Sequence, residues 1–230
     1  MPFSLAIETS SRHGSVTFGR DGRIVETVTL DQQRRHNVEL IPAVDALSKR
    51  HGARCDDIDQ VYVSIGPGSF TGLRVAVATV KMLAYVNSVR IAAVPTVEVV
   101  RDNAPEDRQH VAVCLNSKGD RMYCGVYRRD GRSWRCTAGP ELMTSAQLVE
   151  LVKHDGVAVL GDHLPAHDWP TNIEVLGPAL AVPRSEIVWQ LGRRMIESGA
   201  CADPFTLTPL YARPPEAVEL WEKNRSGREK

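Results

Sequence analysis

The chain of 230 residues carries 28 lysines and arginines against 28 aspartates and glutamates, so its formal net charge at pH 7 is zero. This balance argues against independent nucleic-acid binding, which usually requires a basic excess or patch. No apolar run reaches the ~18 residues that a membrane span needs, and no signal-peptide pattern opens the sequence. Five scattered cysteines without a Cys-x-x-Cys pair indicate reduced thiols, so we expect a cytoplasmic protein.

The first half of the chain alternates between strand and helix patterns. Asp21-Gly22, placed between two strand-like runs, is a strong hairpin signal. Asn37 can cap a helix, and Pro42 lies late enough in that helix to kink it. The predicted strands cover residues 3–8, 14–19, 24–30, 61–65 and 89–94, and the predicted helices cover 37–52 and 73–86.

The stretch Gly66-Pro-Gly-Ser-Phe-Thr-Gly72 joins a buried strand to a helix. Its glycines and proline turn the chain sharply, and Ser69 or Thr71 can cap the helix. The glycines serve the backbone geometry, and contact of the loop with an anion or a partner stays open. The helix is apolar almost all round, so we expect it to be largely buried. Its only charges, Arg74 and Lys81, share one face and suggest a site or an interface.

After a polar connection the order of elements repeats, less regularly. Asp130-Gly131 marks another hairpin, and Thr144 with Gln147 forms a capping-box pattern at a helix start. Both halves therefore consist of three strands, a helix, a strand and a helix, and we divide them at residues 1–105 and 106–230, the second with a C-terminal tail. The predicted strands of the second half cover 111–115, 122–128, 133–137 and 157–160, and its helices cover 145–153 and 185–197.

Two such halves in tandem predict an α/β protein with the actin-like (ribonuclease H-like) ATPase fold, which sugar kinases share. In that architecture, loops from both halves hold phosphates through backbone N–H groups. An active phosphotransferase normally offers aspartate at the corresponding strand ends, where this chain has Glu8 and Asn116, so we expect no catalytic residue. The residues that could contact a nucleotide or anion are Glu8, Ser10, Ser11, Gly68, Ser69, Thr71 and Asn116.

Several segments together indicate a known family. The most specific is Gly66-Pro-Gly-Ser-Phe-Thr-Gly-Leu-Arg74 with the helix behind it. Through these segments the chain closely resembles, over nearly its whole length, the TsaB family of bacterial tRNA threonylcarbamoyladenosine biosynthesis proteins. The supporting matches are Leu5-Ala-Ile-Glu-Thr-Ser10, Arg34-Arg-His36 with Glu39, Gly161-Asp162 and Leu210-Tyr-Ala-Arg213.

The resemblance implies a non-catalytic scaffold subunit that dimerises with the catalytic subunit TsaD, in a complex that the ATPase TsaE joins. Without a partner, we expect a homodimer through the same surface, formed by the helices from Asn37 and Gly72. The resemblance implies no required cofactor or metal, leaves ATP or ADP open at or near the complex interface, and implies no direct contact with tRNA or a membrane. The expected interface residues are Arg35, His36, Glu39, Leu40, Arg74, Val77, Ala78 and Lys81.

Two other functions are weighed against this one. An autonomous actin-like ATPase or sugar kinase would depend on Glu8, and the neutral Asn116 argues against it. A protease ranks last, because Ser69 lacks the Gly-x-Ser-x-Gly spacing of a nucleophile elbow. The one His-x-x-x-His spacing, His163 to His167, is interrupted by a proline, which rules out a regular helix presenting both imidazoles to a metal.

Overall fold

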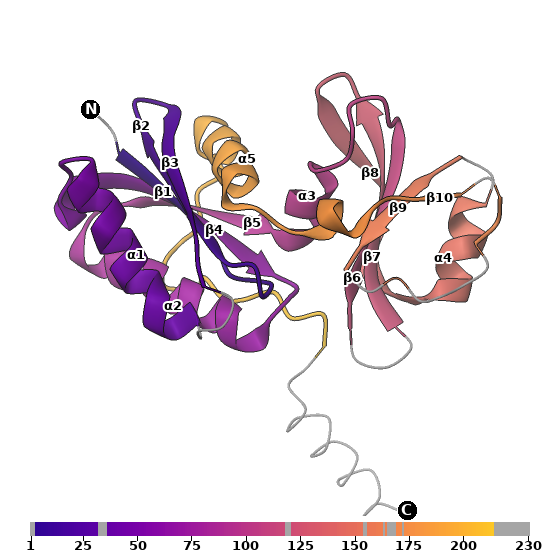
Figure 1. Ribbon diagram of the computed structural model, residues 1–230, viewed down its shortest axis with the longest axis horizontal. Helices are drawn as coiled ribbons and strands as arrows, with labels where there is room; N and C mark the ends of the chain where they lie inside the picture. The colour runs from indigo at the N-terminus through magenta and orange to yellow at the C-terminus, as the bar shows by residue number, and fades with distance from the viewer. Residues whose placement is uncertain are drawn as a thin grey trace, which may run out of the picture.

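Two five-stranded sheets stand side by side along the long axis of the molecule (Figure 1). The computed structural model describes residues 3–31, 36–117, 121–153, 156–162, 164, 169–171 and 173–213; of His36 and Asn37 it describes the backbone alone. Within these ranges, no helix combines the length and the apolar character that a membrane crossing requires.

The first sheet has the strand order β3-β2-β1-β4-β5. The hairpin strands β2 and β3 run antiparallel to their neighbours, whereas β4 lies parallel to β1 and β5 lies parallel to β4. The strands are β1 (Phe3–Glu8), β2 (Ser15–Arg20), β3 (Arg23–Thr29), β4 (Ile58–Gly66) and β5 (Arg90–Pro95).

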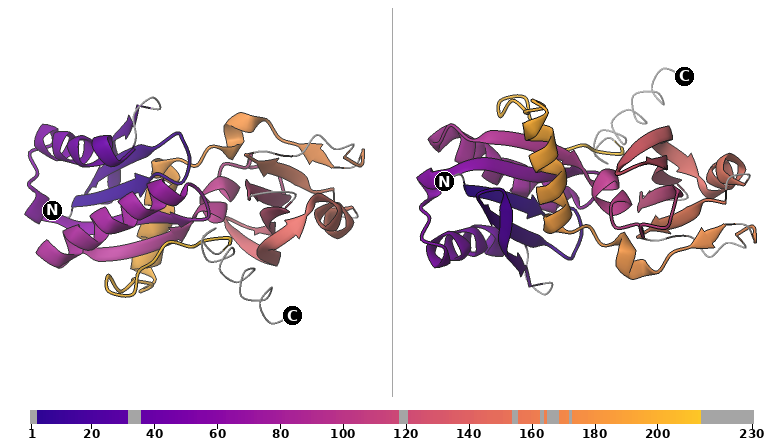
Figure 2. Two further views of the ribbon diagram at one scale, coloured as in Figure 1. Left: turned by 90° about the horizontal axis from the view of Figure 1, so that it is seen from below. Right: turned by 90° about the horizontal axis from the view of Figure 1, so that it is seen from above.

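Helices cover both faces of this sheet, as the two views of Figure 2 show. Odd-numbered residues of β1 and β4, such as Leu5 and Val61, pack with α1 (His36–Arg50) and α2 (Phe70–Val86). Even-numbered residues pack with α5 (Ser185–Glu197) on the opposite face. Alternate side chains of a strand point to opposite faces, so a strand that is apolar throughout requires both layers.

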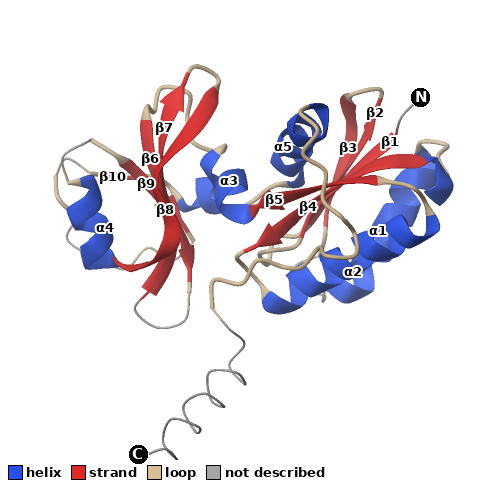
Figure 3. Ribbon diagram, turned by 180° about the vertical axis from the view of Figure 1, so that it is seen from behind, coloured by secondary structure: helices blue, strands red, loops and turns tan. Residues whose placement is uncertain are grey.

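The second sheet repeats the topology of the first, in the order β10-β9-β6-β7-β8. Here α4 (Ser145–Val152) covers one face, and α3 (Thr96–Arg101) with the 3₁₀ turn η2 (Pro178–Ala181) covers the other, so that α3 lies between the sheets (Figure 3). A further 3₁₀ turn, η1 (Cys55–Asp57), precedes β4. The strands are β6 (His110–Asn116), β7 (Arg121–Asp130), β8 (Ser133–Thr144), β9 (Ala158–Gly161) and β10 (Glu174–Val175).

The repeated strand order confirms the predicted actin-like fold of two tandem halves. Most predicted elements are confirmed to within a few residues, and the capping box of Thr144 and Gln147 is present. Three features differ from the prediction. The short helix α3 and the strand β10 were not predicted, and β8 extends to Thr144.

The expectation that the helix at 185–197 completes the second half is wrong. This helix, α5, packs against all five strands of the first sheet. The Trp189 indole N–H donates to the Ser4 hydroxyl (2.9 Å), and the Ser185 backbone N–H donates to the Ser15 hydroxyl (3.1 Å). Tyr62, Ala92 and Val94 of this sheet share one apolar cluster with buried side chains of α5. The division at residue 105 stays a prediction.

The expectation that the helix behind the glycine loop is largely buried is wrong for one face. The inner face of α2 is buried, with Leu73, Ala76 and Val80 fully covered. The outer face exposes Met82, Tyr85 and Val86, at 67%, 87% and 73% of their surface. In the described part of the chain, α1 packs beside α2 on this side of the sheet (Figure 3), and the outer surface of α2 still carries these exposed apolar side chains.

Candidate functional site

The glycine loop at the end of β4 is anchored on the segment that follows β1. The Ser69 backbone N–H donates to the Ser10 carbonyl (2.6 Å), and the Thr9 hydroxyl donates to the Gly72 carbonyl (2.8 Å). The Ser69 hydroxyl also accepts from the Gly72 backbone N–H (3.2 Å), so Ser69, rather than Thr71, caps α2. The sequence had left both residues open.

Two glycines of this loop permit a close approach between backbones. A Cβ atom on Gly68 would lie 2.3 Å from the Ser10 carbonyl oxygen, and one on Gly72 would lie 1.9 Å from the Thr9 carbonyl oxygen. Both distances are far shorter than a nonbonded contact allows. The glycines therefore serve the docking of loop on loop, and the Ser69 and Gly72 N–H groups are used within the protein.

The chain near residue 210 closes the other side of the loop. The Leu210 backbone N–H donates to the Ile65 carbonyl (2.7 Å), and the ring centroids of Tyr211 and Phe70 lie 5.1 Å apart. The Arg74 guanidinium lies over the Phe70 ring, 4.4 Å from its centroid. These contacts join two segments on which the family resemblance rests, one near the middle of the chain and one near its end.

A cleft of about 340 Å³ lies between the two halves. The structure brings four of the predicted nucleotide or anion contacts, Ser10, Ser11, Gly68 and Asn116, to its walls. Ser69 and Thr71 do not line it, since Ser69 caps α2 and Thr71 is exposed on that helix. The remaining lining residues are His13, Pro67, Thr96, Leu115, Gly161, Asp162, Pro178, Ala181, Val182 and Pro183.

Several polar groups around the cleft bond within the protein, whereas the buried Ser10 hydroxyl has no hydrogen-bond partner among the described residues. The carboxylate of Glu8 is fully buried, and its Oε1 accepts from the Ser10 backbone N–H (2.5 Å). The Asn116 backbone N–H donates to Asp162 Oδ1 (2.7 Å). Asp162 is a residue that site reasoning from the sequence missed, although Gly161-Asp162 was a family match. Glu8 is thus enclosed within the protein, whereas Asn116 and Asp162 are exposed at the cleft wall.

The described part of the chain contains no group of three or more His, Cys, Asp or Glu side chains placed to hold a metal ion. The spacing of His163 and His167 lies outside the described residues.

The expected interface residues divide into four groups. Arg35 and the side chain of His36 lie outside the described residues, whereas Arg74 and Ala78 are exposed on α2. Glu39 is half-buried and accepts from the Asp31 backbone N–H (2.6 Å), and Lys81 donates to the Phe205 carbonyl (3.4 Å).

Leu40 and Val77 are corrections, because both are buried in the core between the helices and the first sheet. Leu40 is fully buried and Val77 is 5% exposed, so neither side chain can meet a partner on the surface. The family resemblance had implied them together with Glu39 and Ala78, but neighbours in a helix point in different directions.

The outer surface of α1 and α2 instead exposes large apolar side chains. Val38 and Ile41 of α1 are 61% and 52% exposed. Ile41, Met82 and Val86 border one groove of about 390 Å³ between the helices. A second groove of about 410 Å³ continues from α2 to the loop of Phe205. We call this surface the helical face; it consists of Val38, Ile41, Met82, Tyr85, Val86 and Phe205.

Comparisons with known proteins agree with the resemblance seen in the sequence. The family model of TsaD, tRNA N6-adenosine threonylcarbamoyltransferase, matches residues 23–182. Two relatives carry the name tRNA threonylcarbamoyladenosine biosynthesis protein TsaB. That of Bacillus subtilis is 24% identical over 228 residues, covering 94% of this chain and 96% of the relative. That of Haemophilus influenzae is 23% identical over 235 residues, covering 98% of each.

A solved structure shares the fold. YeaZ from Pseudomonas aeruginosa superimposes with a TM-score of 0.76 at 21% identity, covering 92% of this chain and 100% of that chain. The predicted resemblance to TsaB is therefore confirmed, and so is the fold.

Proposed function

This chain belongs to the TsaD family, described as tRNA N6-adenosine threonylcarbamoyltransferase, and we propose that it is a non-catalytic scaffold subunit of the machinery that makes threonylcarbamoyladenosine in tRNA. The observation that carries this proposal is the helical face. All six of its side chains are more than half exposed, and all except Val38 border two adjoining grooves. Contiguous apolar surface of this kind typically marks a protein–protein interface.

The partner that fits this face is the catalytic, TsaD-like member of the same family. A homologous chain would present a similar pair of helices, and two apolar helix pairs bury each other well. Binding would stabilise one conformation of the partner, because a ligand shifts an equilibrium toward the state that it binds better. In the absence of that partner, two copies of this chain would pair through the same face.

The environments of Glu8 and Asn116 support a non-catalytic role. Glu8 is enclosed and hydrogen-bonded to the Ser10 backbone. Asn116 is neutral at the position where a phosphotransferase would offer a carboxylate. We therefore assign the transfer chemistry to the partner and ATP turnover to a TsaE-like subunit, with nucleotide binding at or near the complex interface. Because the relatives are named for tRNA modification, we propose a cytoplasmic location.

The pairing is tested with charged substitutions on the helical face. We expect Ile41→Glu and Val86→Glu together to weaken binding to the TsaD-like subunit by about 2–4 kcal/mol, the cost of burying charge in the centre of an interface. Isothermal titration calorimetry measures the affinity, and size-exclusion chromatography measures self-association. Leu151→Glu is the matched control, since Leu151 is a similarly exposed apolar residue on α4 (43%). Equal affinity for the helical-face variant and the control would refute the pairing surface.

The function is tested by reconstitution of the pathway. The mixture contains tRNA, threonine, bicarbonate, ATP, the synthase that catalyses the first step of threonylcarbamoyladenosine formation, and the TsaD-like and TsaE-like subunits. Mass spectrometry then quantifies threonylcarbamoyladenosine. We expect the product to require this chain and to persist with Glu8→Gln, which preserves the side-chain shape. Product formation without this chain would overturn the proposal. Magnesium-dependent ATP hydrolysis by the isolated chain, lost in Glu8→Gln, would favour the autonomous ATPase instead.

A further inference from the structure

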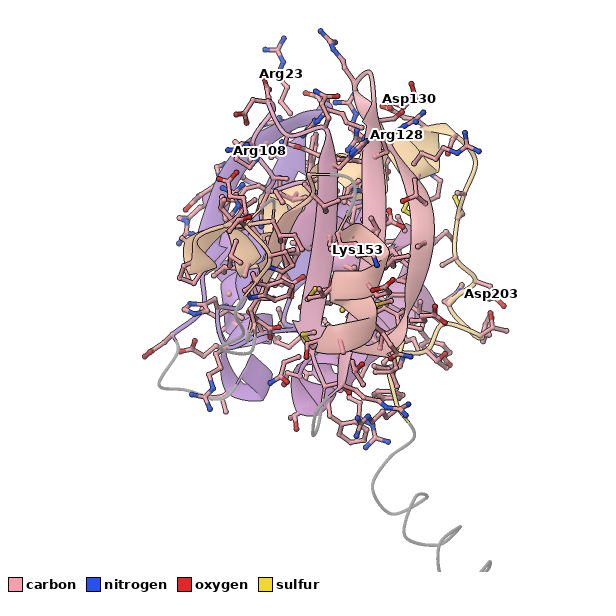
Figure 4. The ribbon with its side chains drawn as sticks, turned by 90° about the vertical axis from the view of Figure 1, so that its right-hand side faces the viewer. Arg23, Arg108, Arg128, Asp130, Lys153 and Asp203 are labelled. Atoms are coloured by element: carbon pink, nitrogen blue, oxygen red, sulfur yellow. The ribbon has the colours of Figure 1, made fainter. Side chains whose placement is uncertain are left out.

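An arginine-rich hairpin joins β7 and β8 at one end of the second sheet. Residues 128–135 read Arg-Arg-Asp-Gly-Arg-Ser-Trp-Arg, four arginines with one aspartate in a chain of zero net charge. Figure 4 shows Arg128 and Asp130 at this end of the sheet, far from Lys153 at the end of α4. Positive charge is therefore concentrated in this hairpin, although the chain as a whole has no net charge.

Arg128 and Arg135 lie directly opposite each other on β7 and β8, and both are exposed. Directly opposite residues on antiparallel strands point to the same face, with their Cβ atoms about 5 Å apart. This is the face that α4 covers further along, since Val126 and Ala138 are the next pair in its packing. Arg132 adds a third exposed cation in the turn.

These three arginines make no ion pair with any carboxylate in the described ranges, and Asp130, two residues from Arg128, forms none either. Like charges placed directly opposite destabilise a sheet. A bound anion would relieve that repulsion, and each planar guanidinium can hold a phosphate through two parallel hydrogen bonds.

The fourth arginine holds the hairpin rigid. Arg129 points to the opposite face, where its guanidinium lies over the Trp134 ring, 4.0 Å from the centroid. It also donates to the carbonyls of Arg108 (3.0 Å) and Pro105 (3.1 Å), in the connection between the sheets. Its role is structural, and it fixes the strands that carry Arg128 and Arg135. A rigid site loses less entropy when it binds.

We propose that Arg128, Arg132 and Arg135 form an auxiliary contact with the phosphodiester backbone of tRNA. The inference rests on the proposed function, which brings this chain into a complex that acts on tRNA, and it departs from the expectation that this chain does not touch tRNA. The contact is independent of sequence and weak by itself, as suits a patch of three charges on a neutral protein.

The test uses the reconstituted complex and an unmodified tRNA transcript. We expect Arg128→Glu combined with Arg135→Glu to raise the KM for tRNA on the order of tenfold while kcat is unchanged. We also expect a weaker salt dependence of tRNA binding. The slope of the logarithm of the association constant against the logarithm of the salt concentration should become less steep by about one to two, because each phosphate contact contributes roughly 0.7–0.9 to that slope. The variant with Lys at both positions should retain most of the affinity, because it keeps the charges.

Arg90→Glu is the control for net charge. It is compared with the single substitutions Arg128→Glu and Arg135→Glu, each of which changes the net charge by the same amount. Arg90 is exposed at the start of β5, in the other sheet, so we expect no change in KM. An unchanged KM and salt slope in the hairpin variants would overturn the proposal. So would loss of complex assembly in those variants, which would assign the patch to a protein partner. Omitting this chain altogether tests the scaffold function separately.

Discussion

At the residue scale, the five thiols occupy distinct environments. Cys114 and Cys124 face each other across β6 and β7 and are buried, whereas Cys55, Cys136 and Cys201 are exposed. The neighbouring Cys124 thiol and burial raise the pKa of Cys114 well above its ordinary value. Partial burial also raises the pKa of Cys136. Since the thiolate is the reactive form, a raised pKa slows reaction at a given pH.

We therefore expect a graded reaction with an aromatic disulfide reagent at pH 8. Cys55 and Cys201 should react first, Cys136 more slowly, and the buried pair only after unfolding. The difference between Cys136 and the first two should shrink as pH rises, because more of the Cys136 thiol then ionises. Peptide mass spectrometry of the labelled protein identifies each site. Prompt labelling of Cys114 in the folded protein would contradict the burial of Cys114 and Cys124.

At the element scale, the start of α2 depends on its contact with the segment after β1. Alanine within a helix normally stabilises relative to glycine by about 1 kcal/mol. At Gly72 the sign should reverse, because the added Cβ would lie 1.9 Å from the Thr9 carbonyl oxygen. We expect Gly72→Ala to lower the free energy of unfolding by about 1–3 kcal/mol, the usual cost of overpacking.

Urea denaturation measures this effect, and Gly177→Ala is its control. Gly177 has a φ of −60°, and a Cβ there meets no atom within 4 Å, so this change should be close to neutral. A stabilised Gly72→Ala protein would show that the loop can move away from Thr9 at little cost.

The orientation of α2 also explains why Val77 was wrongly expected in the interface. The sequence of α2 is apolar on nearly every side, and its composition cannot tell which side meets the sheet. The structure buries Leu73, Ala76 and Val80 and leaves Met82 and Tyr85 outside. The signal was present in part, since Arg74 and Lys81 were predicted to share a face, and that side of the helix also carries Ala78 and Met82.

At the scale of the whole molecule, the chain returns from the second half to stabilise the first. Trp189 of α5 is 5% exposed, its ring meets Tyr62 edge to face at a centroid distance of 6.2 Å, and its indole is hydrogen-bonded to Ser4. Trp189→Ala should cost about 3–5 kcal/mol, as expected for an aromatic side chain removed from a core. Hydrogen exchange should accelerate mainly in β1 and β4.

Leu148→Ala is the counterpart in the second half, since Leu148 of α4 is fully buried against β7 and β8. There we expect faster exchange in β6 and β7 with the first sheet little affected. Identical exchange patterns in the two variants would show that the two sheets unfold as one cooperative unit.

The sequence by itself determined most of the succession of strands, loops and helices, the capping box of Thr144 and Gln147, and the family. These features are local, because hydrophobic period, turn residues and caps act within a few residues of one another. The tertiary structure alone decided that α5 covers the first sheet, that Leu40 and Val77 are internal, and that Asp162 meets Asn116. Each of these depends on which distant segment buries a given face, and that choice is made by packing between elements that the local pattern does not connect.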